Sequence, residues 1–282
     1  MNPKVSVLMS CKNSDPILLK CTINAVLGQT YQDFEVIIVD DGSDSPMESV
    51  VRAISADSRI KILRLAPSGL GAALSFGIMQ CNGEYIARID DDDLMTSDRL
   101  EKQVTFLDNH QDVCCVGSHR YSLVSNRYAK HRKFPLEHEQ ILYSLLSLKW
   151  SMAHSALMYR KDSVVKAGCY RIKGTGEDLD LLLQLSLVGK LANLDDYLLF
   201  YRLRMSSLSV NYSQLPGHLF ALKEYKKSEE YLTNAEIVDK SITAIENKMK
   251  SKDNKYLWKR WLAFVLILIF GKRLPKELLA YN

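Results

Sequence analysis

Four short segments rich in β-branched residues recur through the first third of the chain and alternate with segments of helical periodicity. They cover residues 4–10, 34–40, 60–65 and 84–90. Between the first two, apolar residues recur at helical spacing from Leu19 to Leu27, a pattern typical of an amphipathic helix. Strands that alternate with helices predict an α/β fold, in which a mostly parallel sheet is covered by helices on both faces.

The later part of the chain predicts a second region of different character. Further strands are expected at residues 113–118, 155–160 and 197–203, and further helices near 98–109, 139–148 and 178–188. From about Pro216 the pattern changes to long charged helical segments, in which we expect no strands. We therefore predict a main α/β domain of residues 1–215 and a helical, basic C-terminal extension of residues 216–282.

The net charge of +4 is unevenly distributed. Residues 240–282 contain ten Lys and Arg against three acidic residues, a net of +7, which leaves residues 1–239 with a net of −3. A net acidic main domain argues against a nucleic-acid partner. The basic extension indicates a partner of its own.

Cysteine usage and the N-terminus predict a cytoplasmic protein. The six cysteines are scattered, and none has the paired spacing of a zinc or redox motif, which is typical of a reducing compartment. The first apolar run is too short for a secretory signal. No run reaches the roughly 18 apolar residues that a membrane span needs.

Polar and charged residues follow three of the first four predicted strands. They are Ser10 to Asn13, Asp40 to Gly42 and Asp90 to Asp93. In open α/β sheets ligands bind beyond the carboxyl ends of the strands, so these groups should face one crevice. Asp40 and Asp41 could accept hydrogen bonds from a base or a ribose, and Gly42 permits a tight turn; the alternative is an Asp-Gly turn that caps the next helix.

The four consecutive aspartates predict a cation site. Adjacent carboxylates disfavour one another's ionisation unless a divalent cation compensates their charge. Oxygen ligands suit Mg²⁺ or Mn²⁺, which often complete their shells with nucleotide phosphates. The alternative is an acidic loop that caps the helix starting near Ser97 and Asp98.

Two later segments could complete such a site. Glu177 and Asp178 follow two glycines at the start of an apolar helix, where one of them could act as a general base or both could serve only the helix dipole. Arg202 and Arg204 follow a predicted strand and could bind phosphate, although a solvated loop is an alternative. His154 is more readily interpreted as structural.

Taken together and in this order, these segments resemble the family 2 glycosyltransferases, inverting enzymes with the GT-A fold. The resemblance covers about residues 3–210 and rests on VSVLMSCKN, AVLGQTYQDFEVIIVDDGS, GEYIARIDDDD followed by RLEKQ, GEDLDLLLQL and LLFYRL. Two turns depart from the family pattern: residues 10–13 lack the usual Pro and Tyr, and Ser68 and Ser75 stand where asparagines often occur.

The resemblance implies a UDP-sugar donor, with Mn²⁺ or Mg²⁺ as cofactor, and assigns roles by motif position. Asp40 would contact the base and Asp41 the nucleoside. Asp92 would be the most direct metal ligand, with Asp90 and Asp93 beside it, and Asp91 would be a middle position that tolerates replacement. The donor-binding set implied in this way is Ser10, Asn13, Asp40, Asp41, Gly42, Arg88, Asp90, Asp91, Arg202 and Arg204. Asp178 would be the catalytic base, paired with Glu177.

The implied reaction is a single in-line displacement. The acceptor oxygen would attack the anomeric carbon while Asp178 takes its proton and the metal neutralises the leaving diphosphate. The transferred sugar is expected to be a hexose, with glucose or galactose favoured. The alternatives are a sugar nucleotidyltransferase and a non-catalytic nucleotide-sugar-binding protein.

Residues 255–273 place ten apolar residues between basic clusters, with Trp258 and Trp261 at one edge. Tryptophan beside Lys and Arg suits the headgroup region of a bilayer, so we expect peripheral contact with anionic membrane at the cytoplasmic face of the inner membrane. A core helix or a dimer interface is the alternative. Membrane contact makes a lipid-linked sugar acceptor plausible, as in bacterial surface polysaccharide assembly.

Overall fold

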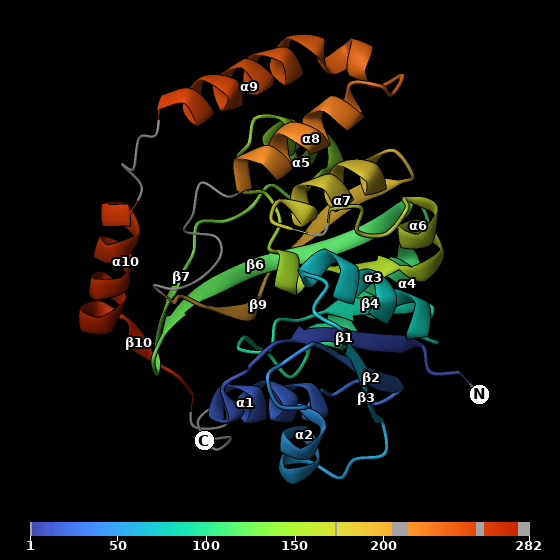
Figure 1. The fold of residues 1–282 in the computed structure, drawn as a ribbon, viewed down its shortest axis with the longest axis vertical. Coiled ribbons are helices and arrows are strands. Elements are labelled where there is room, and N and C mark those ends of the chain that lie inside the picture. Colours follow the sequence, from blue (N-terminus) through green and yellow to red (C-terminus); the bar gives the residue numbers. More distant parts are fainter. Residues whose placement is uncertain (1, 173, 205–213, 252–256, 276–282) are drawn as a thin grey trace.

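One mixed sheet of ten strands forms the centre of the protein in a computed structural model that describes residues 2–172, 174–204, 214–251 and 257–275 (Figure 1). Its first half is parallel, in the order β4-β1-β2-β3. These strands are β1 (Val5–Cys11), β2 (Phe34–Asp41), β3 (Ile60–Leu65) and β4 (Tyr85–Arg88). The helices between them are α1 (Pro16–Leu27), α2 (Glu48–Ile54) and α3 (Leu70–Gln80). The predicted α/β class is thereby confirmed.

The second half of the sheet is mostly antiparallel. It contains β5 (Leu94–Met95), β6 (Val113–Val124), β7 (Arg127–Lys130), β8 (Met158–Arg160) and β9 (Lys190–Arg202). β8 pairs antiparallel with both β4 and β6, whereas β6 and β9 run parallel and are interrupted by three register shifts. The helices of this half are α4 (Arg99–Asn109), α5 (His138–Leu146), α6 (Lys161–Lys166) and α7 (Glu177–Ser186).

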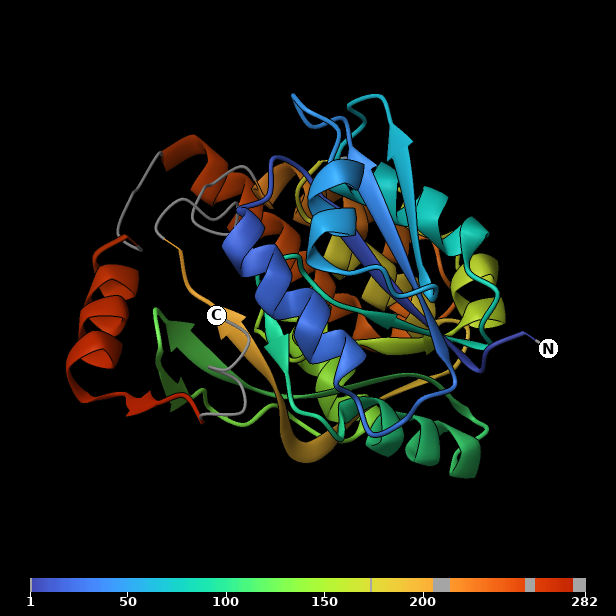
Figure 2. The same ribbon diagram turned by 90° about the horizontal axis from the view of Figure 1, so that it is seen from below.

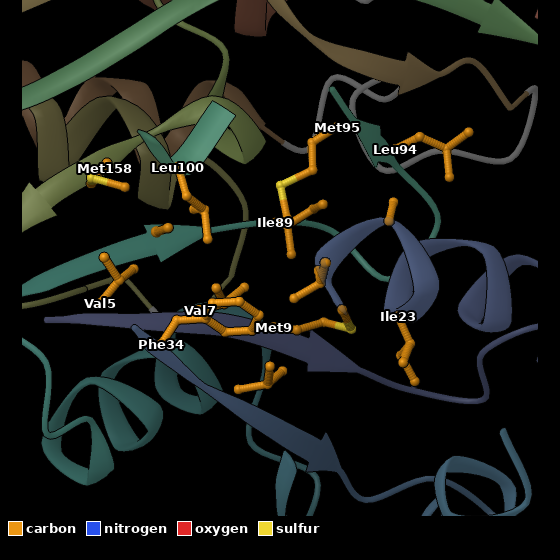
Figure 3. Close-up of a cluster of buried hydrophobic side chains, with 14 of the residues drawn as sticks. Val5, Val7, Met9, Ile23, Phe34, Ile89, Leu94, Met95, Leu100 and Met158 are labelled. Atoms are coloured by element: carbon orange, nitrogen blue, oxygen red, sulfur yellow. The ribbon is translucent and has the colours of Figure 1, made fainter. Parts of the chain in front are cut away.

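Two hydrophobic cores cover the two faces of the sheet. Alternate residues of β1 point to opposite faces, as the strand period of two requires: Val5, Val7 and Met9 join the core under α1, α2 and α4, whereas Leu8 joins the core under α3 and α7. Figure 3 shows the first of these cores around Phe34 and Leu100.

The C-terminal extension is helical, as expected, but it also contributes a strand. α8 (Leu215–Tyr225) packs on α7, and α9 (Tyr231–Ser251) packs on α8. α10 (Leu257–Phe270) stands at the margin of the molecule beside β7, as Figures 1 and 2 both show. The two-residue strand β10 (Lys272–Arg273) then pairs antiparallel with β7, which corrects the expectation that no strand would follow Pro216.

One predicted strand is also shorter than expected. Residues His154–Ala156 form a 3-10 turn, so that β8 begins only at Met158. Among the described residues, no helix is long and apolar enough to cross a membrane. All six cysteines are free thiols.

Candidate active site

The ends of β1, β2 and β4, which the predicted polar and charged residues follow, lie at one edge of the sheet, as predicted. Cys11 at the end of β1 is in register with Asp40 of β2, and Arg88 at the end of β4 is in register with Leu8. The loops that follow these strands therefore lie side by side. Ser10 is in register with Val39 and is half-buried at this edge.

Asn13 joins the loops that follow β1 and β2. Its backbone N–H donates to Ser43 Oγ (2.8 Å), its Nδ2 donates to Asp44 Oδ2 (3.1 Å), and its Oδ1 accepts from the Asp44 backbone N–H (2.8 Å). Asn13 has φ of 49°, a left-handed conformation that asparagine tolerates better than most residues. The predicted donor-binding residue Asn13 thus fixes the shape of the site edge.

Asp40 is almost completely buried and organises the turn after β2. Its carboxylate accepts hydrogen bonds from the backbone N–H groups of Ser43 (2.8 Å) and Met47 (3.1 Å), and from Arg64 Nη1 (3.0 Å). Burial acts to raise the pKa of Asp40, but the hydrogen bonds from Ser43 and Met47 and the charge of Arg64 together hold it below its usual value. Asp40 is therefore ionised at neutral pH.

Asp41 and Gly42 shape the adjacent turn. Asp41 Oδ1 accepts from the backbone N–H (2.7 Å) and the hydroxyl (2.9 Å) of Ser68. Gly42 has φ of 67°, and a Cβ atom there would lie 2.4 Å from Pro67 Cδ, so only glycine fits. A hollow of about 450 Å³ opens beside this turn, lined by Gly42, Ser43, Asp44, Arg64, Leu65, Ala66 and Pro67.

The four aspartates after β4 have four different partners. Asp90 Oδ1 forms an ion pair with Arg88 Nη2 (2.5 Å), and Asp91 accepts a hydrogen bond from the Ser14 hydroxyl. Asp92 Oδ2 lies 2.6 Å from Arg204 Nε. Asp93 is fully buried and accepts from Ser155 Oγ (2.6 Å) and from the Arg202 backbone N–H (2.7 Å).

These partners separate the predicted roles. Asp90 and Asp92 keep part of their carboxylate surface exposed. Both carboxylate oxygens of Asp93 accept hydrogen bonds inside the protein. Its role as a metal ligand stays a prediction, because neither oxygen is free to bind a cation in the described structure. Asp91 was predicted to be a replaceable middle position. The structure shows that it also binds Ser14 in the loop before α1.

Negative charge at this run is only partly compensated. The pKa of Asp92 is raised to about 7, first by burial and then by Asp90 and Asp91. Burial likewise raises the pKa of Asp91, and raises that of Asp93 well above its usual value. Among the residues described, no group of three or more His, Cys, Asp or Glu is arranged to hold a metal. These carboxylates could hold a divalent cation whose coordination shell includes one or two of them and is completed by oxygens of a bound ligand.

Arg88 connects the aspartates with the start of α7. Its side chain is 2% exposed, and within the described part of the chain its Nε and Nη1 atoms have no hydrogen-bond partner. Its charge acts to lower the pKa of Glu177, while Asp90 acts to raise it, so Glu177 interacts electrostatically with both groups. Buried unpartnered guanidinium atoms are unfavourable, and an anionic ligand would satisfy them.

Glu177 and Asp178 begin α7 but differ in environment. Gly176 precedes them with φ of 91°. Glu177 is buried, and burial, followed by the neighbouring Asp178, raises its pKa to about 8. Asp178 is half-exposed, accepts a hydrogen bond from the Leu179 backbone N–H (2.8 Å) and lines a pocket. At neutral pH Glu177 therefore holds a proton and cannot readily accept one.

Arg202 and Arg204, at and after the end of β9, bring that strand to the aspartates. Arg202 Nε donates to the backbone carbonyl of Asp92 (2.8 Å), and Arg204 pairs with the Asp92 side chain. His154 instead forms a hydrogen bond with the Tyr170 hydroxyl (2.7 Å).

Several contact residues were not singled out from the sequence. Arg64, Ser14 and Ser155 each bind one of the aspartates. Ser14 and Ser155 carry no pattern that would distinguish them from other serines. The position of Arg64 near the end of β3 is a usable signal, because β3 ends at the same sheet edge as β2.

Comparison with known proteins gives consistent matches. Residues 6–168 match the family described as Glycosyl transferase family 2. The O-antigen biosynthesis glycosyltransferase WbnJ of Escherichia coli is 33% identical over 184 residues, which cover 64% of this chain and 71% of WbnJ.

Two solved structures share the fold at low sequence identity. S. aureus TarS 1–349 in complex with UDP-GlcNAc aligns with a TM-score of 0.71 at 17% identity, covering 99% of this chain and 83% of that one. The mannosyltransferase PcManGT from Pyrobaculum calidifontis, in complex with GDP-Man and Mn²⁺, aligns with a TM-score of 0.62 at 16% identity, covering 99% and 79%.

Proposed function

The chain belongs to glycosyl transferase family 2 and has the GT-A fold, and from this premise we propose that it transfers a hexose from a UDP-sugar to a hydroxyl of a lipid-diphosphate-linked sugar. Transfer inverts the anomeric carbon. The similarity to WbnJ, an O-antigen biosynthesis enzyme, supports a role in surface polysaccharide assembly.

The observation that carries the proposal is that residues after β4 and β9 pair at one run of carboxylates, which also interacts electrostatically with the start of α7. Asp90 and Asp92 follow β4, Arg204 follows β9 and pairs with Asp92, and the Arg88 charge acts on both Asp90 and Glu177 at the start of α7. Negative carboxylates for a cation, arginines for phosphate and a carboxylate for proton transfer are the groups that sugar transfer from a nucleotide requires.

The proposed donor is a UDP-sugar, with UDP-glucose or UDP-galactose favoured. The fold relative TarS was solved with UDP-GlcNAc, which supports a uridine nucleotide. Gly42 borders the hollow after β2, and Asp40 and Asp41 directly precede it at the end of that strand. These three residues would contact the nucleoside, while Ser10 and Asn13 form the adjacent edge. Arg202 and Arg204 would contact the diphosphate.

Asp90 and Asp92 would hold Mn²⁺ or Mg²⁺. Their incompletely compensated charge fits a divalent cation, and the fold relative PcManGT was solved with Mn²⁺. When bound, the metal would supply positive charge that stabilises the departing diphosphate.

Asp178 is the proposed base. The acceptor oxygen attacks the anomeric carbon, the bond from that carbon to the diphosphate oxygen breaks with its electron pair leaving on UDP, and the acceptor proton passes to Asp178. Glu177 is unsuited to this role because its pKa is about 8 and it is buried. Asp178 is half-exposed and borders an open pocket.

α10 is the proposed contact with an anionic membrane. It presents exposed apolar side chains, among them Leu266 (45%), Ile269 (57%) and Phe270 (77%), and it is followed by exposed Lys272 and Arg273. Residues 255 and 256 of the predicted membrane segment lie outside the described residues. The helix is linked to the site through the β6–β7 hairpin: Arg127 Nη1 donates to the Gly271 carbonyl (2.9 Å), and Arg202 Nη1 donates to the Ser125 carbonyl (3.4 Å). Attachment of α10 at the cytoplasmic face would bring the site near lipid-linked acceptors.

A donor and acceptor screen tests this function. UDP-sugars are incubated with Mn²⁺ or Mg²⁺ and a GlcNAc- or GalNAc-diphosphate-lipid mimic, and UDP release and product stereochemistry are measured. We expect acceptor-dependent UDP release and an inverted product. Pyrophosphate release from a nucleoside triphosphate and sugar phosphate would support the nucleotidyltransferase instead, and UDP-sugar binding without turnover would support a non-catalytic protein.

A further inference from the structure

A second pocket is lined in part by Asp178. Its volume is about 90 Å³, and its walls come from three segments: the end of α5 with the chain that follows it, the first turns of α7, and the start of α8. The polar lining residues are Lys149, Ser151, Asp178, Gln214 and His218, and the apolar ones are Leu145, Leu148, Trp150, Met152, Leu179 and Leu182. Of these, only Asp178 belongs to the proposed catalytic and donor-binding set.

Two glycines bring the walls of this pocket together. A Cβ atom on Gly217 would lie 2.1 Å from the Thr175 carbonyl oxygen, and one on Gly176 would lie 3.0 Å from Gly217 Cα. The start of α8 therefore touches the backbone directly before α7. This contact holds His218 near Asp178: burial lowers the pKa of His218, and the Asp178 charge opposes that effect. The imidazole is consequently neutral at pH 7 and can accept or donate a hydrogen bond.

Trp150 and Ser151 give the pocket an amphipathic lining. The Trp150 side chain is 48% exposed although it is large and aromatic. Ser151 beside it is 1% exposed, and among the residues described its Oγ has no hydrogen-bond partner. A buried hydroxyl without a partner is destabilising, so a ligand hydroxyl that bonds to it would remove an unfavourable term.

We propose that this pocket is the acceptor subsite and that it binds the terminal pyranose ring of the acceptor. One apolar face of the ring stacks on Trp150, a ring hydroxyl bonds to Ser151, and the attacking hydroxyl lies at Asp178. A lipid chain suits the pocket less well, because it would bury Ser151, His218 and Asp178 without partners. The inference rests on the proposed function, because it assumes that Asp178 receives the proton of an acceptor hydroxyl.

Trp150→Ala tests the stacking contact, with Trp150→Phe as the conservative variant. We expect the acceptor KM of the alanine variant to rise about tenfold, the value of a good aromatic contact, while acceptor-independent UDP release stays at the wild-type rate. The phenylalanine variant should recover most of the affinity. Tyr143→Ala is the matched control, because Tyr143 is a 57% exposed aromatic residue on α5 outside the pocket. Equal acceptor KM values for Trp150→Ala and Tyr143→Ala would overturn the assignment.

Ser151→Ala separates a binding role from a structural one. Loss of an unpartnered buried hydroxyl should leave Tm unchanged or raise it, whereas the acceptor KM should rise. A fall in Tm together with an unchanged KM would mean that the hydroxyl serves the fold, and would overturn its assignment to the ligand.

A binding measurement keeps this inference distinct from the proposed function. Octyl β-glycosides of glucose, galactose, GlcNAc and GalNAc are added to the full chain with UDP, and saturation transfer to the ring protons is recorded by NMR. We expect ring signals with the wild type and Tyr143→Ala, and their loss with Trp150→Ala. Ring signals in the absence of any turnover would support the pocket while refuting the transferase function. Turnover without a difference between the two variants would refute the pocket alone.

Discussion

Replacing Glu177 by glutamine should remove a specific part of the pH dependence of stability. In the folded protein burial, followed by Asp178, raises the pKa of Glu177 from 4.5 to about 8. Between these two pH values the folded state holds a proton that the unfolded state has released. The free energy of unfolding must therefore fall as the pH rises through this window.

The magnitude follows from the same pKa values. Between pH 7 and pH 8 the raised pKa of Glu177 accounts for a loss of about 1 kcal/mol, which corresponds to roughly 2 °C in Tm for a chain of this size. Glutamine has nearly the same shape but cannot ionise. We expect Glu177→Gln to be more stable than the wild type already at pH 7, because the unfolded wild type has released its Glu177 proton there, and we expect this difference to grow by about 1 kcal/mol between pH 7 and pH 8.

Thermal melts at four pH values from 7 to 8.5 measure this difference. Histidines with a lowered pKa, such as His131 and His218, contribute little above pH 7, because even their unfolded forms are then mostly neutral. Glu229→Gln serves as the control, because Glu229 is exposed on the surface. Parallel curves of Tm against pH for the wild type and Glu177→Gln would refute the buried, protonated state of Glu177.

Two further predictions address the metal and the membrane. Asp92→Ala should reduce Mn²⁺-supported UDP release by on the order of 10²-fold or more, whereas Asp91→Ala should lose mainly the Ser14 contact and have a milder effect; equal losses would contradict this division of roles. The double variant Leu266→Glu/Phe270→Glu should no longer pellet with anionic liposomes at low salt, while its turnover of a soluble acceptor should not change. Leu232→Glu is the control, because Leu232 is 80% exposed on α9, and this variant should bind liposomes as the wild type does. Full binding by the double variant would exclude α10 as the contact.

The sequence predicted the site best where a motif coincides with a strand end. Asp40, Asp41 and Asp90 to Asp93 follow apolar runs whose strand character is local, and the rule that parallel strand ends share an edge then brings them together. Their individual partners were not predictable, because Arg64, Ser14 and Ser155 reach them through tertiary packing.

The limits of the strands show the same distinction. β9 begins at Lys190 rather than near residue 197, because its first half pairs with β6 although it contains the polar pair Asp195 and Asp196. β8 loses its first residues because the backbone at 154–156 forms a turn, from which Ser155 donates to Asp93. Trp150, Ser151 and His218 belong to no motif, and only the contact between α7 and α8 brings His218 beside Asp178.

The most direct test of the proposed transferase is the Asp178→Asn variant, assayed with a UDP-sugar and an acceptor that the wild type uses. A well-placed base contributes about 10²- to 10⁴-fold to the rate, so transfer should fall by that order while the Kd for the UDP-sugar, measured by calorimetry, stays close to the wild-type value. An Asp178→Asn variant that transfers sugar at the wild-type rate would contradict the account.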